Sequence, residues 1–296
     1  MTTASLEKTR NVSTSNVNIR ARLGTAFLWI ATLFVVILIL APFLIAIITS
    51  FKNQREALEP TFIPFLQFEP TLANWQAELV SGGRETFAAL GNSAMIAVGS
   101  TTLATVLGTL TGYALGRFRY GLGNQNIVSW VLSQRFLPPV ATIIPFFLLL
   151  QQLQAIDTVP GMILVNTTFV LPFAVLIMRD FFAELPQEIE EAALVDGANP
   201  FQVFFRIALP VALPALTAAA IICFAFAWNE FLFASVMAPN RAKPYTFLVA
   251  STSTVRGVHF GFLSTRMLIA VTLPVVMSLF VQRYIVRGLT LGAVKG

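Results

Sequence analysis

The sequence is poor in charged residues. Asp, Glu, Lys and Arg make up 11% of its 296 residues, whereas hydrophobic residues make up 56%. Soluble domains carry about 25% charged residues, and a soluble globule of this size would need more charge to cover its surface. Together with a mean hydropathy of +0.76, this composition predicts a polytopic membrane protein.

Cysteine and histidine are almost absent, which excludes several classes of site. The chain has one cysteine, Cys223, and one histidine, His259. A disulfide framework, a zinc site of Cys and His, and a catalytic group that needs a second histidine are therefore excluded. Paired aspartates that hold magnesium are not expected either, because the aspartates are far apart: Asp157, Asp180 and Asp196. We predict no enzymatic activity, metal or cofactor for this chain.

Lysine is also scarce, and its positions exclude one way of binding ATP. A Walker A loop needs a Gly-Lys step, and no lysine follows a glycine: they are Lys8, Lys52, Lys243 and Lys295. The net charge of +5 does not indicate nucleic acid, because the basic residues are scattered at the ends of apolar runs. More of them fall on the side of the two termini, so the positive-inside rule predicts that both termini are cytoplasmic.

Long apolar runs, in contrast, are abundant. A helix needs about 20 mostly apolar residues to cross the hydrocarbon core, and six runs qualify: 27–49, 90–115, 127–150, 161–178, 211–237 and 267–286. We therefore expect an all-α polytopic membrane protein with six transmembrane helices in one domain over 26–288. Residues 1–25 are rich in Ser, Thr and Asn and are predicted to be a disordered cytoplasmic tail. Residues 289–296 are predicted to be a cytoplasmic C-terminal tail.

Two of these runs contain residues that are unusual in a membrane helix. The third contains Arg135 and the Pro138-Pro139 pair, and the fourth contains Asn166 and Pro172. Proline inside a membrane helix frees carbonyl groups that neighbouring helices or water must satisfy. Two interpretations follow: kinks that pack a bundle, or helices broken around a translocation path.

The fifth run contains Asn229 and Glu230 near its outer end. A carboxylate at this depth cannot face lipid without a large free-energy penalty, so these side chains should face the bundle interior or a water-filled cavity. They form either a polar clamp between helices, with Arg135 as a possible partner, or part of the solute path near its outer gate.

Residues 184–210 have a pattern of helix starts and stops. Pro186 can open a first helix, and Gly197 can supply the left-handed residue that ends it. Asn199 can then cap a second helix, with Gln202 placed three residues later as in a capping box. A helix–glycine–helix element with small alanines suits a docking surface, although an ordinary solvated loop is the alternative.

Within this element the residues match a known signature. Glu191, Ala192 and Ala193 are followed at fixed spacing by Gly197, Ile207, Leu209 and Pro210, and Asp196 precedes the glycine. This is the EAA signature, and the chain resembles the membrane-spanning permease subunits of binding-protein-dependent ABC importers. Segments 112–117, 137–139, 228–231 and 282–296 are similar to the second permease subunit of the carbohydrate (maltose-type) branch.

The resemblance implies a fold and a set of partners. It implies the type I ABC-importer permease fold in the inner membrane, with the EAA helix docked in a cytoplasmic ATPase. The partners implied are a second permease subunit, two ATPase subunits that carry ATP and Mg²⁺, and an extracytoplasmic solute-binding protein. The loop with Arg256, Gly257 and His259 would contact that binding protein.

The sequence is also compatible with other functions. A permease of the amino-acid, peptide or polyamine branch would share the EAA signature. A secondary transporter would usually carry paired ionic groups inside the membrane, whereas away from the ends of the spans this chain has Arg135 and Glu230.

Overall fold

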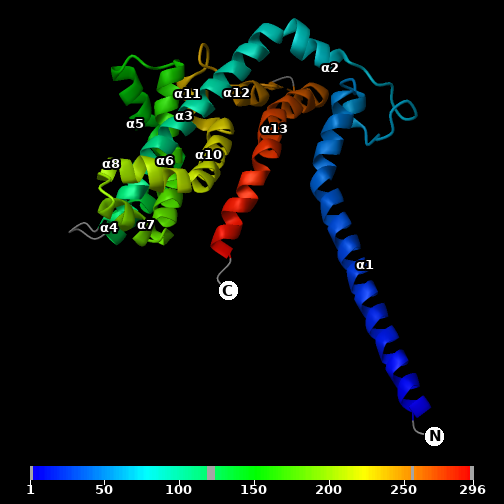
Figure 1. Ribbon diagram of the computed structural model, residues 1–296. Coiled ribbons are helices and arrows are strands. Elements are labelled where there is room, and N and C mark those ends of the chain that lie inside the picture. The colour runs from blue at the N-terminus through cyan, green and yellow to red at the C-terminus, as the bar shows by residue number, and fades with distance from the viewer. Residues whose placement is uncertain (1–2, 119–123, 255–256, 294–296) are drawn as a thin grey trace.

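The computed structural model describes the backbone of residues 3–118, 124–254 and 257–293, and the side chains of 24–118, 126–252 and 257–279. Five long helices dominate these ranges (Figure 1): α1 (Thr3–Ser50), α3 (Gly83–Arg117), α6 (Val159–Glu184), α10 (Leu213–Trp228) and α13 (Phe260–Ala293). Their apolar composition suits a chain that buries side chains in a bilayer.

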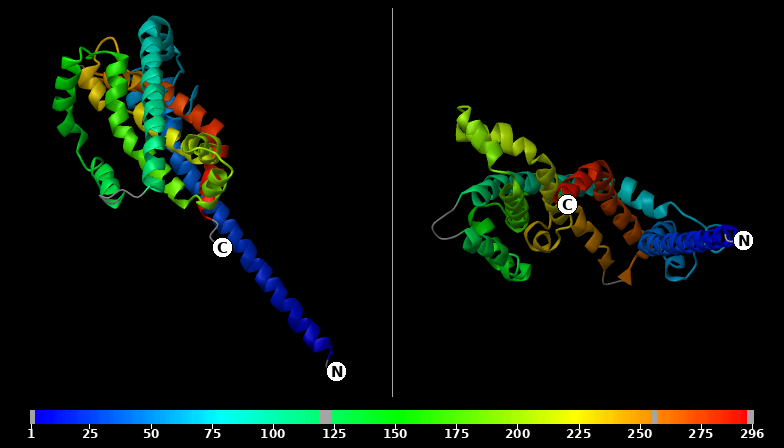
Figure 2. Two further views of the ribbon diagram at one scale, coloured as in Figure 1. Left: turned by 60° about the vertical axis from the view of Figure 1, so that its left-hand side comes forward. Right: turned by 60° about the horizontal axis from the view of Figure 1, so that its bottom comes forward.

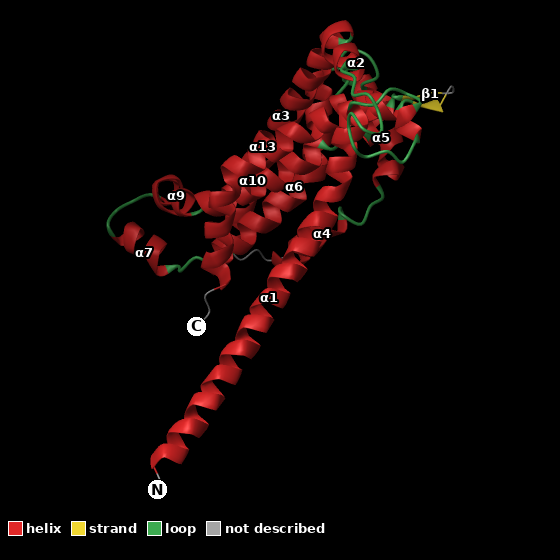
Figure 3. Cartoon of the chain, turned by 90° about the vertical axis from the view of Figure 1, so that its right-hand side faces the viewer, coloured by secondary structure: helices red, strands yellow, loops and turns green. Residues whose placement is uncertain are grey.

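Shorter elements connect the long helices. They are η1 (Glu56–Leu58), α2 (Ala73–Gln76), the π-helical turn η2 (Ala77–Ser81), α4 (Asn124–Ser133), α5 (Pro139–Gln152), α7 (Glu188–Val195), α8 (Pro200–Val203), the π-helical turn η3 (Phe204–Ala208), α9 (Leu209–Val211), α11 (Leu232–Met237) and α12 (Tyr245–Ala250). Strands β1 (Ser253–Thr254) and β2 (Gly257–Val258) form an antiparallel hairpin. Figure 3 shows this hairpin at the same end of the molecule as α2, opposite α7.

The described residues do not establish six spans. Four helices are long and apolar enough to cross a membrane, and a fifth span is possible if the pair Pro200–Val211 and Leu213–Trp228, bent by 71°, counts as one. The span predicted over 127–150 is not one continuous helix, because residues 134–138 separate α4 from α5, and a broken helix was one of its two interpretations. Pro138 is extended, with φ −61° and ψ 125°, and Pro139 then opens α5.

The predicted helix over 211–237 is also interrupted. α10 ends at Trp228 and α11 begins at Leu232, with Asn229, Glu230 and Phe231 between them. The break follows from the polar pair itself, since Glu230 accepts hydrogen bonds from the backbone of α11 and so starts a new helix.

The N-terminal helix differs from the prediction for residues 1–25. α1 begins at Thr3, so a helix occupies most of the segment predicted to be disordered. Residues 3–23 contain neither proline nor glycine. The apolar helix can therefore continue through them, because extending an existing helix is much easier than nucleating one. Figures 1 and 2 show α1 leaving the bundle, with the N-terminus far from the other helices. The apolar stretch of Gly24–Ser50 is not buried within this chain.

The centre of the bundle is the contact between α3 and α6, which run in the same direction. Gly108, Gly112 and Gly116 recur every fourth residue on α3 and so lie on one face. A Cβ at Gly108 would lie 2.5 Å from the Cβ of Ala174. Small residues at this spacing let two membrane helices approach until their backbones touch.

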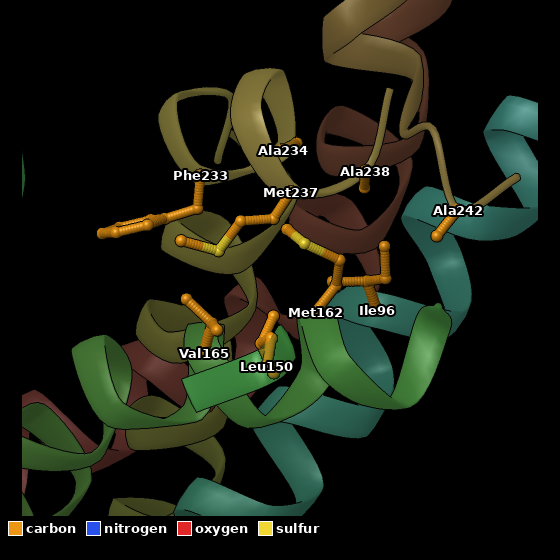
Figure 4. Packing of buried hydrophobic residues seen from close by; sticks show 9 residues of the cluster. All are labelled: Ile96, Leu150, Met162, Val165, Phe233, Ala234, Met237, Ala238 and Ala242. Carbon is orange, nitrogen blue, oxygen red and sulfur yellow. The ribbon is translucent and has the colours of Figure 1, made fainter. Parts of the chain in front are cut away.

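A second packed region joins four helices. Figure 4 shows its residues on α3, α5, α6 and α11 and the loop that follows: Ile96, Leu150, Met162, Val165, Phe233, Ala234, Met237, Ala238 and Ala242. The short helix α11 is therefore held inside the protein, which explains how the interrupted fifth helix is tolerated at membrane depth.

We expect Gly112→Ala to destabilise the bundle. The added Cβ would lie 2.7 Å from the backbone nitrogen of Arg179 and from the Cβ of Met178, and overpacking of this kind costs about 1–3 kcal/mol. The midpoint of thermal unfolding in detergent should fall. Gly91→Ala is the matched control on the same helix, because a Cβ there meets nothing within 4 Å. Equal midpoints for the two variants would contradict the close contact.

Candidate functional site

The 184–210 element has the predicted helix–glycine–helix form. α7 ends at Val195, Gly197 has φ +89°, and α8 begins at Pro200. The capping box is confirmed, since the Gln202 backbone donates to Asn199 Oδ1 and the Asn199 backbone donates to Gln202 Oε1, both at 2.9 Å. α7 begins at Glu188, two residues after the proline predicted to open it.

The EAA residues divide between a free surface and the bundle. Glu191, Ala192 and Asp196 are exposed and Ala193 is half-buried, all on or next to α7. Ile207 and Leu209 are half-buried, and Pro210 is exposed, where the chain returns to α10. Leu209 packs against a buried cluster of Met178, Phe182, Leu185, Phe204, Ala208, Ala212 and Ala219. The first half of the signature therefore presents a surface, and the second half anchors it.

An ion pair between two largely buried side chains attaches α7 to the long helix α3. The guanidinium of Arg117 pairs with Glu190 Oε1 at 2.8 Å, and the hydroxyl of Tyr113 donates to Glu190 Oε2 at 2.9 Å. Arg117 Nη1 also donates to the carbonyl of Leu185 at 2.8 Å. The side chains of Arg117 and Glu190 are 5% and 12% exposed. A displacement of α7 must therefore carry α3 with it or break a largely buried ion pair.

The sequence analysis did not identify Glu190 or Arg117 as functional. Glu190 directly precedes the EAA triplet, and Arg117 is the last residue of α3, where a cation suits the helix C-terminus. Their partnership joins positions 73 residues apart, and no local pattern reveals it.

We expect Glu190→Ala to loosen the attachment of α7 to α3 more than it lowers the stability of the bundle. The change leaves the buried Arg117 guanidinium without its carboxylate, which costs a few kcal/mol, and it detaches α7 from Tyr113 as well. In a complex with the ATPase that the EAA signature implies, stimulation of ATP hydrolysis should drop sharply. Glu188→Ala, at an exposed position on the same helix, should leave the stimulation near normal. Similar losses in both variants would contradict the anchoring role.

The polar residues predicted for a path or clamp are not brought together. Asn166 is buried and donates to the carbonyl of Met162 at 3.0 Å, within its own helix. Asn229 is exposed and donates to the carbonyl of Ala225 at 2.8 Å. Neither contacts another of the predicted path residues through these bonds.

The suggested pairing of Glu230 with Arg135 is not formed. The carboxylate of Glu230 accepts from the backbone nitrogens of Phe233 at 2.6 Å and Ala234 at 3.2 Å. It caps α11, because a new helix start exposes N–H groups that need acceptors. Arg135 instead donates to the carbonyl of Phe169 and lies over the ring of Phe173.

A buried polar network lies at the opposite end of the bundle from α7. Glu78 is fully buried, and its carboxylate accepts from Thr86, Tyr245 and Arg266 at 2.7, 3.0 and 2.8 Å. Arg266 also donates to the carbonyl of Leu248 at 2.6 Å. The network joins η2, α3, α12 and α13, and sequence analysis missed it because its members are up to 188 residues apart.

Of the residues predicted to contact a binding protein, Gly257 begins strand β2 and His259 directly follows it. Gly257 has φ +109° and is exposed, as is His259. Arg256 lies outside the described residues. Gln54 donates to the carbonyl of Val258 at 3.1 Å, which links the hairpin to the segment after α1. The contact with a binding protein stays a prediction.

Comparison with known proteins agrees with this geometry. The family model described as "Binding-protein-dependent transport system inner membrane component" matches residues 104–291. The trehalose transport system permease protein SugB of Mycobacterium tuberculosis is 36% identical over 70% of this chain and 77% of its own length. The trehalose/maltose transport system permease protein MalG of Thermococcus litoralis is 31% identical over 90% of this chain and 95% of its own length.

A solved structure supports the fold. A chain of a bacterial ABC transporter that imports the acidic polysaccharide alginate superposes with a TM-score of 0.72 at 18% identity, covering 89% of this chain and 96% of that one. The chain belongs to the family of inner membrane components of binding-protein-dependent transport systems.

Proposed function

We propose that this chain is a permease subunit of an ATP-driven importer for a sugar or a related solute. The observation that carries the proposal is the exposed EAA helix α7, held on α3 by the pair of Glu190 and Arg117. Relatives named for trehalose and maltose transport support a sugar as the solute.

We infer its partners from the functions that this chain does not supply by itself. The sequence has no Walker A loop, so ATP and Mg²⁺ belong to two ATPase subunits that dock on α7. A second permease subunit completes the path and covers the apolar face of α1, and an extracytoplasmic binding protein delivers the solute to the end that carries the hairpin. Both termini then lie in the cytoplasm, in agreement with the distribution of basic residues.

The helix α3 can transmit the movement of α7 to the outer loops. It is 35 residues long, which corresponds to about 52 Å at about 1.5 Å per residue. Near its outer end, Asn92 donates to the carbonyls of Arg241 and Lys243, and Lys243 pairs with Glu85 at 2.8 Å. Closing of the ATPase pair would move α7, and α3 would then pull on the loop between α11 and α12.

Two other functions can be distinguished from this one. A permease of another importer branch would assemble with ATPases but bind a different solute. A secondary transporter would need coupling groups in the membrane, but Glu230 caps a helix and Arg135 pairs with no carboxylate among the described residues.

Affinity purification followed by uptake measurement tests the proposal. A tagged chain extracted from its native membrane should co-purify with an ATPase and a second permease. The complex in proteoliposomes should then import labelled trehalose or maltose when ATP and the binding protein are supplied. Co-purification without sugar uptake would favour another importer branch, and a chain that purifies without an ATPase would contradict the proposal.

A further inference from the structure

Two helix breaks lie close to a pair of stacked aromatic rings. The first break, 134–138 between α4 and α5, contains Arg135. The second, between α10 and α11, begins three residues after Phe226. Phe226 stacks on Phe173 of α6, with ring centroids 4.6 Å apart and an interplanar angle of 17°. Segments far apart in the sequence therefore place one cation and two rings together in the membrane-spanning region.

The guanidinium of Arg135 lies over both rings. Its central carbon is 3.7 Å from the centroid of Phe173 and 5.4 Å from that of Phe226, and Nη1 donates to the carbonyl of Phe169 at 3.1 Å. Arg135 is exposed within this chain, and the side chain of Phe226 is 51% exposed. We call Arg135, Phe173 and Phe226 the aromatic platform.

The platform cannot face lipid. An arginine at the centre of a membrane helix costs about 2.5–3.5 kcal/mol on insertion scales, and no carboxylate of the described residues pairs with Arg135. Among the described residues, the guanidinium of Arg135 uses one of its five N–H donors, in the bond to the carbonyl of Phe169. Cationic side chains in membrane proteins face the bundle interior or a water-filled cavity, and the exposed position of Arg135 within this chain favours the cavity.

We propose that the aromatic platform is a contact site for the sugar on its way through the membrane, an inference that rests on the proposed function. The exposed face of Phe226 packs against the C–H face of a sugar ring, as aromatic faces pack against apolar surfaces. The remaining N–H groups of Arg135 donate to the ring hydroxyls. Cation–π contact with Phe173 and the bond to Phe169 hold the guanidinium in place for this role.

The chemistry of the platform favours a sugar over an amino acid. An amino acid would pair its carboxylate with Arg135, but its ammonium group needs an acceptor of negative charge, which none of the three platform residues supplies. A hydroxyl-rich ring needs donors and an aromatic face, and both are present. The platform contacts the solute from one side. Its binding is therefore weak enough for the solute to leave, as a translocation path requires.

Uptake by variants of the whole transporter tests the platform. The complex, with its second permease, ATPases and binding protein, is placed in proteoliposomes, and the labelled sugar imported per ATP hydrolysed is measured with trehalose and maltose. Phe226→Leu keeps an apolar side chain but removes the ring, so this ratio should fall about 5-fold, as for loss of an aromatic contact of ordinary strength. Phe226→Tyr should keep the ratio near that of the unchanged protein, and Arg135→Gln should lower it. Phe87→Leu, at a 62% exposed position on α3, is the control.

Three results would overturn the inference. An unchanged ratio in Phe226→Leu, measured with a functioning binding protein, would show that the ring does not contact the sugar. Equal losses of complex yield, ATP hydrolysis and uptake in Phe226→Leu would show that the ring only packs the helices. Absence of sugar uptake by the unchanged protein would contradict the proposed function itself, and with it the assignment of a sugar to the platform.

Discussion

Gly197→Val is expected to abolish transport while the chain still inserts into the membrane. Gly197 has φ +89°, and a left-handed backbone costs a residue with a side chain about 1–2 kcal/mol, more for a β-branched one. A Cβ at this position meets nothing within 4 Å, so the effect comes from backbone strain and not from a clash. Relief of that strain turns α7 away from α8 and misdirects the surface that carries Glu191 and Ala192.

The measurement is ATP hydrolysis by the purified complex, with and without the binding protein loaded with sugar. Gly197→Val should lose the stimulated rate. Gly197→Asn should keep more of it, because asparagine enters the left-handed region more readily than valine. Normal stimulation in the valine variant would mean that the turn does not set the position of α7.

Arg266→Met is expected to destabilise the end of the bundle opposite α7. It leaves the carboxylate of Glu78 fully buried without its cation, and removing one partner of a buried ion pair costs about 3–5 kcal/mol. The bonds from Arg266 to Leu248 and Thr252 are lost as well. The midpoint of thermal unfolding in detergent should fall by several degrees or more.

Two further variants test whether the loss of stability comes from the buried ion pair itself. Lys243→Met breaks the ion pair with Glu85 at the same end, but the Glu85 side chain is 58% exposed, so the loss should be about 1 kcal/mol or less. Replacing Glu78 by Gln together with Arg266→Met removes both charges and should recover part of the stability. If Arg266→Met were as mild as Lys243→Met, the pair would contribute little to stability.

Local signals in the sequence were sufficient for the 184–210 element. A left-handed turn at Gly197 and the capping box of Asn199 and Gln202 depend on residues within four positions of one another. Such patterns can be read without knowledge of the fold. The surface of α7 was predicted for the same reason.

Contacts between distant segments were not accessible in this way. The pairs Glu190–Arg117 and Glu78–Arg266 join helices that the sequence places far apart. Glu230 was assigned to a clamp or a path because a continuous helix was assumed, and in a broken helix the same carboxylate becomes a cap. The platform likewise depends on contacts of Arg135, in one break, with Phe173 of α6 and Phe226 of α10.

One measurement tests most directly whether the chain is part of an ATP-driven importer. Proteoliposomes that contain the complete complex are given labelled sugar and the binding protein, with ATP supplied on the side of α7, and a protonophore is added to remove any proton gradient. The account predicts that uptake continues with the protonophore and stops without ATP. Uptake that proceeds without ATP and stops with the protonophore would contradict it and would identify a secondary transporter.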